Sequence, residues 1–285
     1  MNPYHDFVKG MVRLFEEGKH LPLGGFSPLP RPGLPSDAPA VLIFSPHPDD
    51  EVIIGGLPLR LMRESGRRVI NVAVTQGSLK ERQAARYEEL RRACAHIGFE
   101  LVQTRENGLE KINPEGRKTD PDNWNAAVDR VASILREHPA EALFFPHDDD
   151  FNTTHIGTHH LVVEALKKLG DVSCWAVETE FWGAMKGPNL MVGITPRDTT
   201  DLLTALSFHE GEVRRNPYHL RMPGWLMDNV RRGGEVVGGQ GGAVPDFPFA
   251  TLYRLRRWEK TGFRETFTGG RVLPPNGNPA SLFQS

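Results

Sequence analysis

The chain has 285 residues, of which 39% are hydrophobic and 25% charged, which is ordinary for a globular protein with a substantial core. Its 34 basic and 36 acidic residues leave a formal net charge of −2, so the charge balance gives no reason to expect a nucleic-acid partner. The two cysteines are too few for a disulfide framework, and they favour a reducing, cytoplasmic setting.

The first forty residues differ in composition from the rest of the chain. Tyr4–Glu17 has apolar residues at helical spacing and predicts an amphipathic helix. Leu21–Pro39 is rich in proline and glycine and predicts a linker ordered by packing rather than by regular structure. No stretch resembles a signal peptide or approaches the roughly 20 apolar residues of a membrane helix. We therefore expect a non-exported, cytoplasmic protein with no membrane partner.

From residue 40 onward, apolar runs of strand length alternate with helical patterns. Strands without polar alternation are typical of a parallel sheet that is covered on both faces. The sequence therefore predicts an α/β, Rossmann-like fold with a mostly parallel sheet and helices on both faces. The expected strands cover residues 40–44, 68–74, 100–103, 142–145 and 172–177, and the expected helices 52–64, 80–97, 123–137 and 156–169.

After about residue 180 this alternation weakens, and we expect extra C-terminal elements. They comprise a helix over 198–209, a strand over 250–257, a mobile glycine-rich loop over 233–242 and a poorly ordered tail from Pro274. The expected division of the chain is an N-terminal helix and linker (1–38), one main domain (39–260) and a C-terminal tail (261–285).

The strongest chemical signal is the run Ser45-Pro46-His47-Pro48-Asp49-Asp50-Glu51, directly after the first strand. Acidic residues at a helix start can be simple caps, but caps explain neither His47 nor the two prolines that flank it. Ligands bind beyond the carboxyl ends of the strands in this class of fold. Imidazole and carboxylate at short range indicate a divalent metal site, with Zn²⁺ as the leading ion. A neighbouring carboxylate can then act as general base.

A second cluster, residues 146–160, follows the strand over 142–145 and reads P-H-D-D-D-F-N-T-T-H-I-G-T-H-H. The alternative interpretation, without a functional role, is a solvated acidic turn capped by Thr153 or Thr154. Because the first and fourth strands of such a sheet can be neighbours, we expect the two loops to converge. His155 lies at the helix start and is the better third ligand. His159 and His160 are expected to support the site or to pack against the core.

The paired motifs P-H-P-D-D-E and N-T-T-H resemble those of the LmbE/PIG-L-like, zinc-dependent N-acetylglucosaminyl deacetylases. Three further segments are similar to this family, and together they extend the resemblance over roughly residues 40–210. They are V-T-Q-G at 74–77, R-Y-E-E-L at 86–90 before Ile97-Gly98, and A-L-S-F-H at 205–209. The resemblance implies that His47, Asp50 and His155 hold one metal ion and that Asp49 is the general base.

The second motif departs from the family pattern, which commonly has H-x-D-H. Asn152 stands in place of a histidine that helps to stabilise the oxyanion, and Thr154 replaces an acid. Asn152 can still donate a hydrogen bond to an oxyanion, and His147 is a candidate replacement for the missing histidine. Arg86 and His209 are further candidates for substrate contact, although Arg86 is also explained by ion pairs on a helix surface. Among the tryptophans, Trp182 is the candidate for a place beside the substrate.

These observations together predict a hydrolase that removes an N-acyl group, with acetyl expected, from an amino-sugar-like small molecule. The expected cofactor is one Zn²⁺ per chain, with Fe²⁺ as the alternative ion. Two other readings stay open: a metallohydrolase for another amide or ester, such as a glycopeptide or natural-product conjugate, and a ligand-binding homologue that has lost turnover. The sequence leaves the exact substrate and the oligomeric state unknown.

Overall fold

The computed structural model describes residues 2–181, 183–260 and 262–284. Within these residues, nine strands form one sheet in the order β3-β2-β1-β4-β5-β7-β6-β9, with β8 paired to β7. The strands are β1 (Ala40–Ser45), β2 (Arg68–Ala73), β3 (Glu100–Gln103), β4 (Ala142–Pro146), β5 (Ser173–Thr179), β6 (Leu190–Ile194), β7 (Phe249–Glu259), β8 (Gly262–Glu265) and β9 (Arg271–Leu273).

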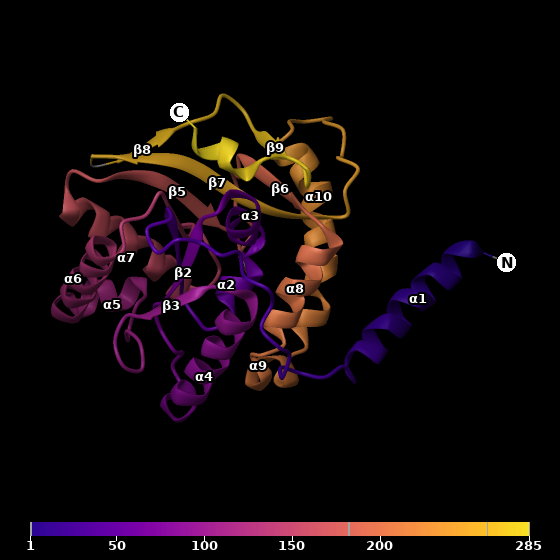
Figure 1. The fold of residues 1–285 in the computed structure, drawn as a ribbon, viewed down its shortest axis with the longest axis horizontal. Coiled ribbons are helices and arrows are strands. Elements are labelled where there is room, and N and C mark those ends of the chain that lie inside the picture. The colour runs from indigo at the N-terminus through magenta and orange to yellow at the C-terminus, as the bar shows by residue number, and fades with distance from the viewer. Residues whose placement is uncertain (1, 182, 261, 285) are drawn as a thin grey trace.

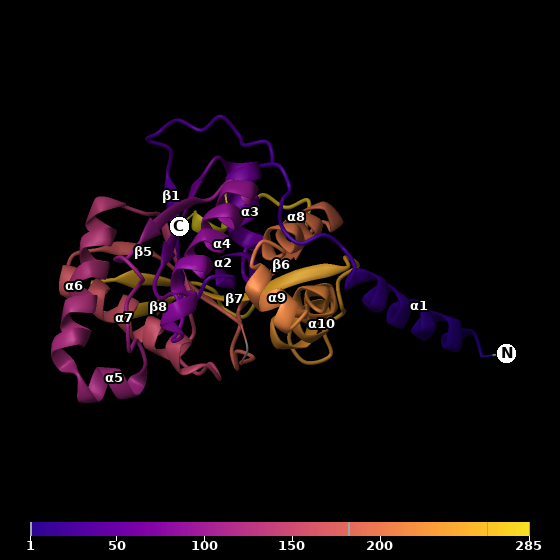
Figure 2. The same ribbon diagram turned by 90° about the horizontal axis from the view of Figure 1, so that it is seen from below.

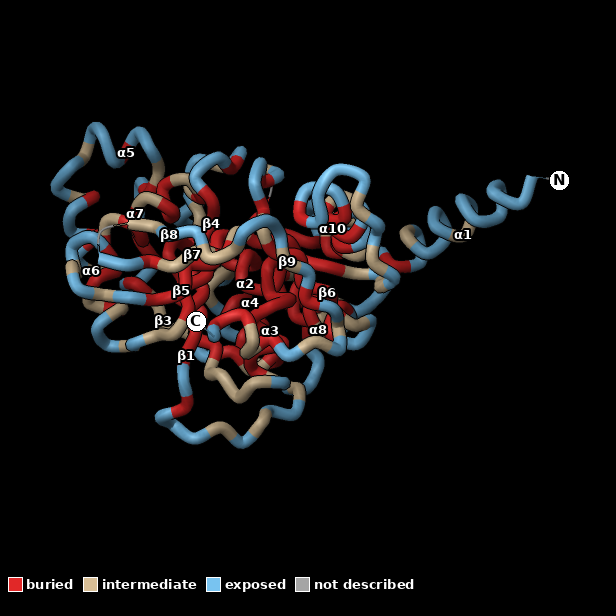
Figure 3. The backbone as a smooth tube through the Cα atoms, turned by 90° about the horizontal axis from the view of Figure 1, so that it is seen from above, coloured by how far each residue is buried: buried red, intermediate tan, exposed pale blue. Residues whose placement is uncertain are grey.

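The five strands from β3 to β5 are parallel, and β7 runs antiparallel to β5 and β6. The mostly parallel α/β fold predicted from the sequence is therefore confirmed. Side chains alternate between the two faces of a strand. In β1, Val41 and Ile43 pack into one hydrophobic core, and Leu42 and Phe44 pack into a second core on the other face. This double burial explains why the strand has no polar alternation (Figure 3).

Helices cover both faces of the sheet (Figures 1 and 2). Residues of α3, α4 and α8 contribute to one core, and residues of α6 and α7 contribute to the other. The α-helices are α1 (Pro3–Gly18), α2 (Asp50–Ile53), α3 (Gly56–Ser65), α4 (Lys80–Ile97), α5 (Pro114–Thr119), α6 (Pro121–Glu137), α7 (Thr153–Leu169), α8 (Pro196–Leu206), α9 (Glu210–Arg215) and α10 (Met222–Val236), and the short 3₁₀ helices are η1 (Tyr218–Leu220) and η2 (Pro279–Phe283).

The predicted amphipathic helix near the N-terminus is α1, which projects away from the body of the molecule (Figure 1). Residues 21–39 form the predicted linker without helix or strand. It is ordered by packing, because Leu23 and Leu34 lie against the core. Among the described residues, none of the helices has the length and apolar character that crossing a membrane would require.

The single helix predicted over 52–64 is in fact two helices, α2 and α3, that are separated at Gly55. A Cβ atom on Gly55 would lie 2.6 Å from Leu202 Cδ2, and one on Gly56 would lie 2.6 Å from Thr251 Oγ1. The two glycines therefore let the chain turn in close contact with α8 and β7. This tight contact depends on segments about 150 and 200 residues away, so the local pattern could not reveal it.

The predicted loop over 233–242 is wrong in its first part, because α10 continues to Val236. Gly233 belongs to this helix because the helix packs tightly on the sheet, where a Cβ atom would lie 2.6 Å from Met191 Sδ. The segment from Pro274 is also not a loose tail, since Leu282 and Phe283 are buried against the core. The helix predicted over 198–209 ends at Leu206. The division of the chain into 1–38, 39–260 and 261–285 stays a prediction.

Candidate metal centre

The two motif loops meet at the carboxyl edge of the sheet, because β1 and β4 are parallel neighbours. The loop after β1 carries His47 and leads into α2 at Asp50. The loop after β4 leads into α7, whose first turn carries His155. The predicted convergence of the two loops is confirmed.

His47, Asp50 and His155 form a triangle of potential ligand atoms. His47 Nδ1 lies 3.3 Å from His155 Nε2, and each of these nitrogens lies 3.4 Å from Asp50 Oδ2. A tetrahedral zinc ion with bonds of about 2.0–2.1 Å would hold its ligands about 3.3–3.4 Å apart. The triangle therefore matches one face of a tetrahedron and leaves the fourth position for another ligand. The residues present fit a catalytic zinc ion, although other divalent ions use similar ligands.

The surroundings of this triangle favour positive charge. Asp50 and His155 are buried, and Asp50 Oδ1 has no hydrogen-bond partner in the part of the chain that the structure describes. Burial alone would raise the pKa of Asp50, but His155 and His47 hold it below its ordinary value. Burial alone would lower the pKa of His155, but the carboxylates of Asp50 and Asp150 raise it to about 9. A buried site that attracts protons in this way is also suited to a cation.

Asp49 is held in a strained conformation beside the triangle. Its φ is 113°, which is rare for a residue with a side chain. Its side chain makes no capping hydrogen bond to α2, so the simple cap interpretation does not describe it. Instead, the carboxylate accepts a hydrogen bond from the Tyr218 hydroxyl. Burial, together with the nearby negative charge of Asp50, raises the pKa of Asp49 to about 7, which is a suitable value for a general base near neutral pH.

Glu51 holds the backbone of Asp49 in place. Glu51 Oε2 accepts a hydrogen bond of 3.0 Å from the Asp49 amide, and Glu51 Oε1 accepts one of 2.9 Å from His209 Nε2. Both Glu51 and His209 are fully buried. Burial alone would lower the pKa of His209, but Glu51 raises it. His209 thus lies behind Asp49 and precedes α9, rather than ending a helix as the sequence suggested.

The structure offers no free donor on His147, although the sequence made it a candidate for oxyanion contact. Its Nε2 donates to the carbonyl oxygen of Gly183 over 2.9 Å, and its Nδ1 accepts from the Asp149 amide over 3.2 Å. The side chain is buried and tied to the backbone at both nitrogens. It therefore shapes the loop after β4.

Asn152 caps α7 by accepting a hydrogen bond of 2.9 Å from the Thr154 amide. This cap uses only the side-chain oxygen, so the amide nitrogen is the group that could donate to a substrate oxygen. Contact of Asn152 with an oxyanion stays a prediction. Trp182, another candidate from the sequence, lies outside the described residues.

Arg86 stabilises the first motif loop from α4. Its Nη2 donates to the carbonyl oxygen of Pro48 over 3.2 Å, and its Nε lies 3.8 Å from Glu212 Oε1. Gly77 makes room for it, because a Cβ atom there would lie 2.3 Å from Arg86 Nη1. Arg86 is thus mostly buried and connects distant segments, unlike the ion pairs along one helix surface that the sequence also allowed.

The sequence did not single out two residues that contact this site, Asp150 and Tyr218. Asp150 Oδ2 lies 3.4 Å from His155 Nδ1, on the side of the ring opposite Nε2. Carboxylates commonly orient metal-binding histidines in this way. The run of three aspartates at 148–150 was a signal for such a residue but did not indicate which one. Tyr218 is far in sequence from both motifs, and no local signal points to it.

His159, on α7, contacts the end of β4, where the second motif loop begins. Its Nδ1 lies 2.9 Å from the carbonyl oxygen of Pro146, and burial lowers the pKa of the imidazole. It lies outside the triangle of ligand atoms. His160, the next residue, is partly buried and stacks edge-on against the His159 ring.

Residues 42–166 match the family model for PIG-L, GlcNAc-PI de-N-acetylase. This segment contains the three potential ligands, Asp49 and Asp150. Over this segment the chain resembles the LmbE/PIG-L-like deacetylases. The match ends before Tyr218 and His209, so the contacts of these two residues with the motif lie outside the matched segment. No curated protein sequence matches the chain.

Solved structures share the fold of this chain. N,N'-diacetylchitobiose deacetylase from Pyrococcus horikoshii has a TM-score of 0.56 at 18% identity, with 87% of this chain and 92% of the other covered. The teicoplanin deacetylase Orf2 has a TM-score of 0.55 at 16% identity, with 77% and 98% covered. The 4-carboxy-2-hydroxymuconate hydratase of Pseudomonas putida KT2440 has a TM-score of 0.55 at 16% identity, with 76% and 95% covered. The likeness at this identity concerns the fold, which hosts more than one reaction.

Proposed function

We propose that the protein is a zinc-dependent hydrolase that removes an N-acyl group from an amino-sugar-like small molecule. The observation that carries the proposal is the triangle of His47, Asp50 and His155 with donor atoms 3.3–3.4 Å apart. The match to a de-N-acetylase family over residues 42–166 supports the reaction type. Two buried free thiols, Cys94 and Cys174, fit the cytoplasmic location that we also propose.

The substrate would approach through a polar cavity of about 280 Å³ that His47 lines. Hydroxyl, amide and ammonium groups around this cavity suit the hydroxyls of a sugar. The side chains that provide them belong to Thr75, Ser78, Lys80, Gln83, Lys111, Asn113 and Thr154.

A zinc ion held by His47, Asp50 and His155 would polarise the acyl carbonyl and lower the pKa of water. Asp49 lies beside this position and takes a proton from the attacking water. The carbon–nitrogen bond then breaks as Asp49 delivers this proton to the leaving amine. The acyl group leaves as a carboxylic acid that contains the water oxygen, and at neutral pH this acid loses its remaining proton to the amine or to solvent. Tyr218 and Glu51 keep the Asp49 carboxylate and backbone in position for both transfers.

The substitution Asp49→Asn tests this assignment. Asparagine tolerates positive φ at least as well as aspartate, so the backbone is expected to be preserved. We expect kcat on N-acetylglucosamine or a related N-acyl sugar to fall roughly 10²- to 10⁴-fold, while zinc binding stays within a few-fold of wild type. The exposed Asp149→Asn variant is the matched control, because Asp149 pairs with Lys186 at the surface.

A panel of substrates distinguishes this function from the two alternative hypotheses, a metallohydrolase of another class and a binding protein without turnover. Turnover of simple amides or esters at rates equal to those of N-acyl sugars would favour a metallohydrolase of another class. A wild-type protein that binds N-acyl sugars with zinc present and shows no turnover would favour a binding protein. In that case Asp49→Asn would leave ligand affinity nearly unchanged.

A further inference from the structure

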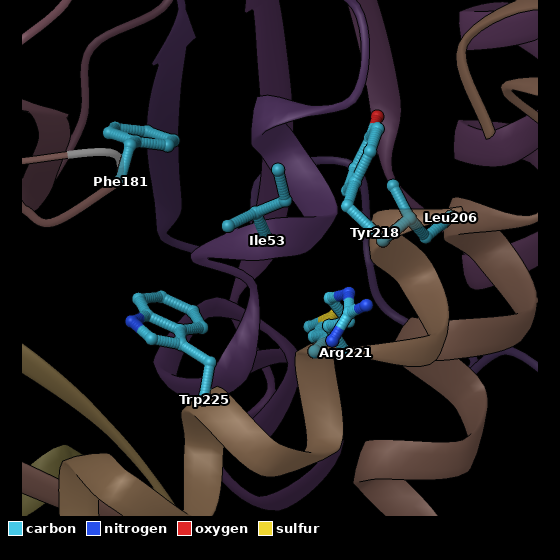
Figure 4. Close-up of a pocket in the computed structure, with 7 residues that line it drawn as sticks. Ile53, Phe181, Leu206, Tyr218, Arg221 and Trp225 are labelled. Atoms are coloured by element: carbon cyan, nitrogen blue, oxygen red, sulfur yellow. The ribbon is translucent and has the colours of Figure 1, made fainter. Parts of the chain in front are cut away.

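A second cavity lies next to the candidate metal centre and differs in character from the polar one. It has a volume of about 310 Å³ and is formed by α2, α8, η1, α10 and the loop after β5. Figure 4 shows its side chains facing one another around Ile53. The apolar part of the lining consists of Ile53, Phe181, Leu206, Met222 and Trp225.

Three contacts connect this apolar cavity with the centre. The Phe181 ring packs edge-on against the His155 ring, with 4.6 Å between the ring centroids. The Tyr218 ring lines the cavity while its hydroxyl donates to Asp49. Ile53 belongs to α2, the short helix that begins at Asp50. The apolar cavity is therefore bounded by side chains that contact a proposed ligand and the proposed base.

The centre thus has a polar cavity at His47 and an apolar cavity at Phe181 and Tyr218. An N-acyl amino sugar has the same two-sided character. A trans amide directs its acyl group and its nitrogen substituent away from each other. If the sugar hydroxyls occupy the polar cavity, the acyl group points toward the apolar one.

We propose that the apolar cavity binds the acyl group of the substrate and that this group is larger than acetyl. The inference rests on the proposed N-deacylase function and specifies its substrate class. A volume of 310 Å³ has room for roughly ten non-hydrogen atoms at about 30 Å³ each, the volume of a water molecule in the liquid. An acetyl group would place one methyl group there. A linear or aromatic acyl group of about six to eight carbons fills the space and removes its apolar surface from water.

Hydrolysis of a series of N-acyl glucosamines tests the proposal. The zinc-loaded, full-length protein is assayed with the acetyl, butanoyl, hexanoyl and octanoyl derivatives. Each buried methylene should raise kcat/KM by roughly fourfold until the cavity is full. Octyl N-acetylglucosaminide is the control, because it carries the same chain on the sugar side. A rate that rises with this chain, and not with the acyl chain, would overturn the assignment to the acyl group.

A pair of methionines on α10 gives matched variants. Met222 is buried and lines the cavity, whereas Met227 on the same helix is 52% exposed and lies outside it. Met222→Trp should lower the ratio of octanoyl to acetyl kcat/KM at least tenfold, and Met227→Trp should leave this ratio unchanged. If Met222→Trp does not fold, the half-buried Trp225→Ala widens the cavity and should move the preference toward longer chains.

Binding of octanoate, the product of the longest substrate, provides a readout that does not depend on turnover. Octanoate should change the fluorescence of Trp225 in the metal-free protein, and the Trp225→Phe variant should lose this change. Absence of octanoate binding would overturn the proposal, as would acetyl hydrolysis that is as fast as octanoyl hydrolysis while the N-deacylase function stands. If none of the N-acyl glucosamines is hydrolysed, the proposed function fails and the acyl assignment fails with it.

Discussion

The carboxylate of Asp150 is expected to set the metal affinity of the centre without contacting the metal. Its Oδ2 lies 3.4 Å from His155 Nδ1, and its Oδ1 accepts a hydrogen bond of 2.7 Å from the backbone N–H of Asn152. The Asp150→Asn variant keeps a side-chain oxygen for the backbone N–H of Asn152 and places an NH₂ group beside His155. This group cannot accept the Nδ1 proton, so the ring loses both an orienting partner and a negative charge.

Loss of such a partner typically weakens metal binding 10- to 100-fold, which corresponds to about 1.4–2.7 kcal/mol. The upper part of this range is expected here, because Asp150 and His155 are both buried and the interaction is little screened by water. The dissociation constant for Zn²⁺ is measured by competition with a chromogenic chelator, and Asp149→Asn is the control. Asp149 is exposed and one position away, so its substitution should change zinc affinity less than twofold.

Two results would refute this reasoning. One is an Asp150→Asn affinity within twofold of wild type, which would show that Asp150 does not orient His155. The other is an equal loss in Asp149→Asn, which would show that net charge near the loop, and not the contact with His155, controls affinity. Circular dichroism of both variants checks that the fold is retained.

Two further predictions concern stability. Zn²⁺ at about 1,000 times its dissociation constant should stabilise the native state by about 4 kcal/mol and raise Tm by roughly 5–15 °C. Differential scanning calorimetry checks this shift, and its persistence in His155→Ala would contradict the site. Gly157→Ala should destabilise the fold by about 1–3 kcal/mol, because the new Cβ would lie 2.4 Å from the Ile112 carbonyl oxygen. It should also weaken zinc binding, because residue 157 is two positions after His155 on the same helix. Gly10→Ala, with no atom within 4 Å of its Cβ, is the control in urea denaturation, and equal midpoints for the two variants would contradict the packing argument.

Much of the fold could be predicted because burial on both faces leaves a continuous apolar signal in the central parallel strands β1 and β4. The strand over 100–103 and the helix over 80–97 have the predicted bounds. Errors occur at glycines, where local propensity and tertiary packing disagree. Gly233 favours a loop by propensity, but the sheet approaches it so closely that only a glycine fits, and the helix continues.

The position of the site could be predicted from one rule, that ligands bind at the carboxyl ends of parallel strands. The rule predicted that His47 and His155 lie close together although they are 108 residues apart in the sequence. It could not find Tyr218, which reaches Asp49 from a 3₁₀ helix after the main series of strands. Nor could it show that His147 has both nitrogens bound to backbone groups, since this depends on the path of residues 149 and 183.

The three acids of the first motif show most clearly where sequence reasoning stops. Asp49, Asp50 and Glu51 are consecutive, yet one faces Tyr218, one joins the ligand triangle and one accepts hydrogen bonds from His209 and from the Asp49 amide. The first of the three, Asp49, also has an unusual backbone φ of 113°. That conformation is unfavourable in isolation and persists because surrounding contacts stabilise it. His209, which binds Glu51, and Tyr218, which binds Asp49, each lie more than 150 residues away from their partner. The distinct roles of three adjacent carboxylates are therefore a property of the folded chain.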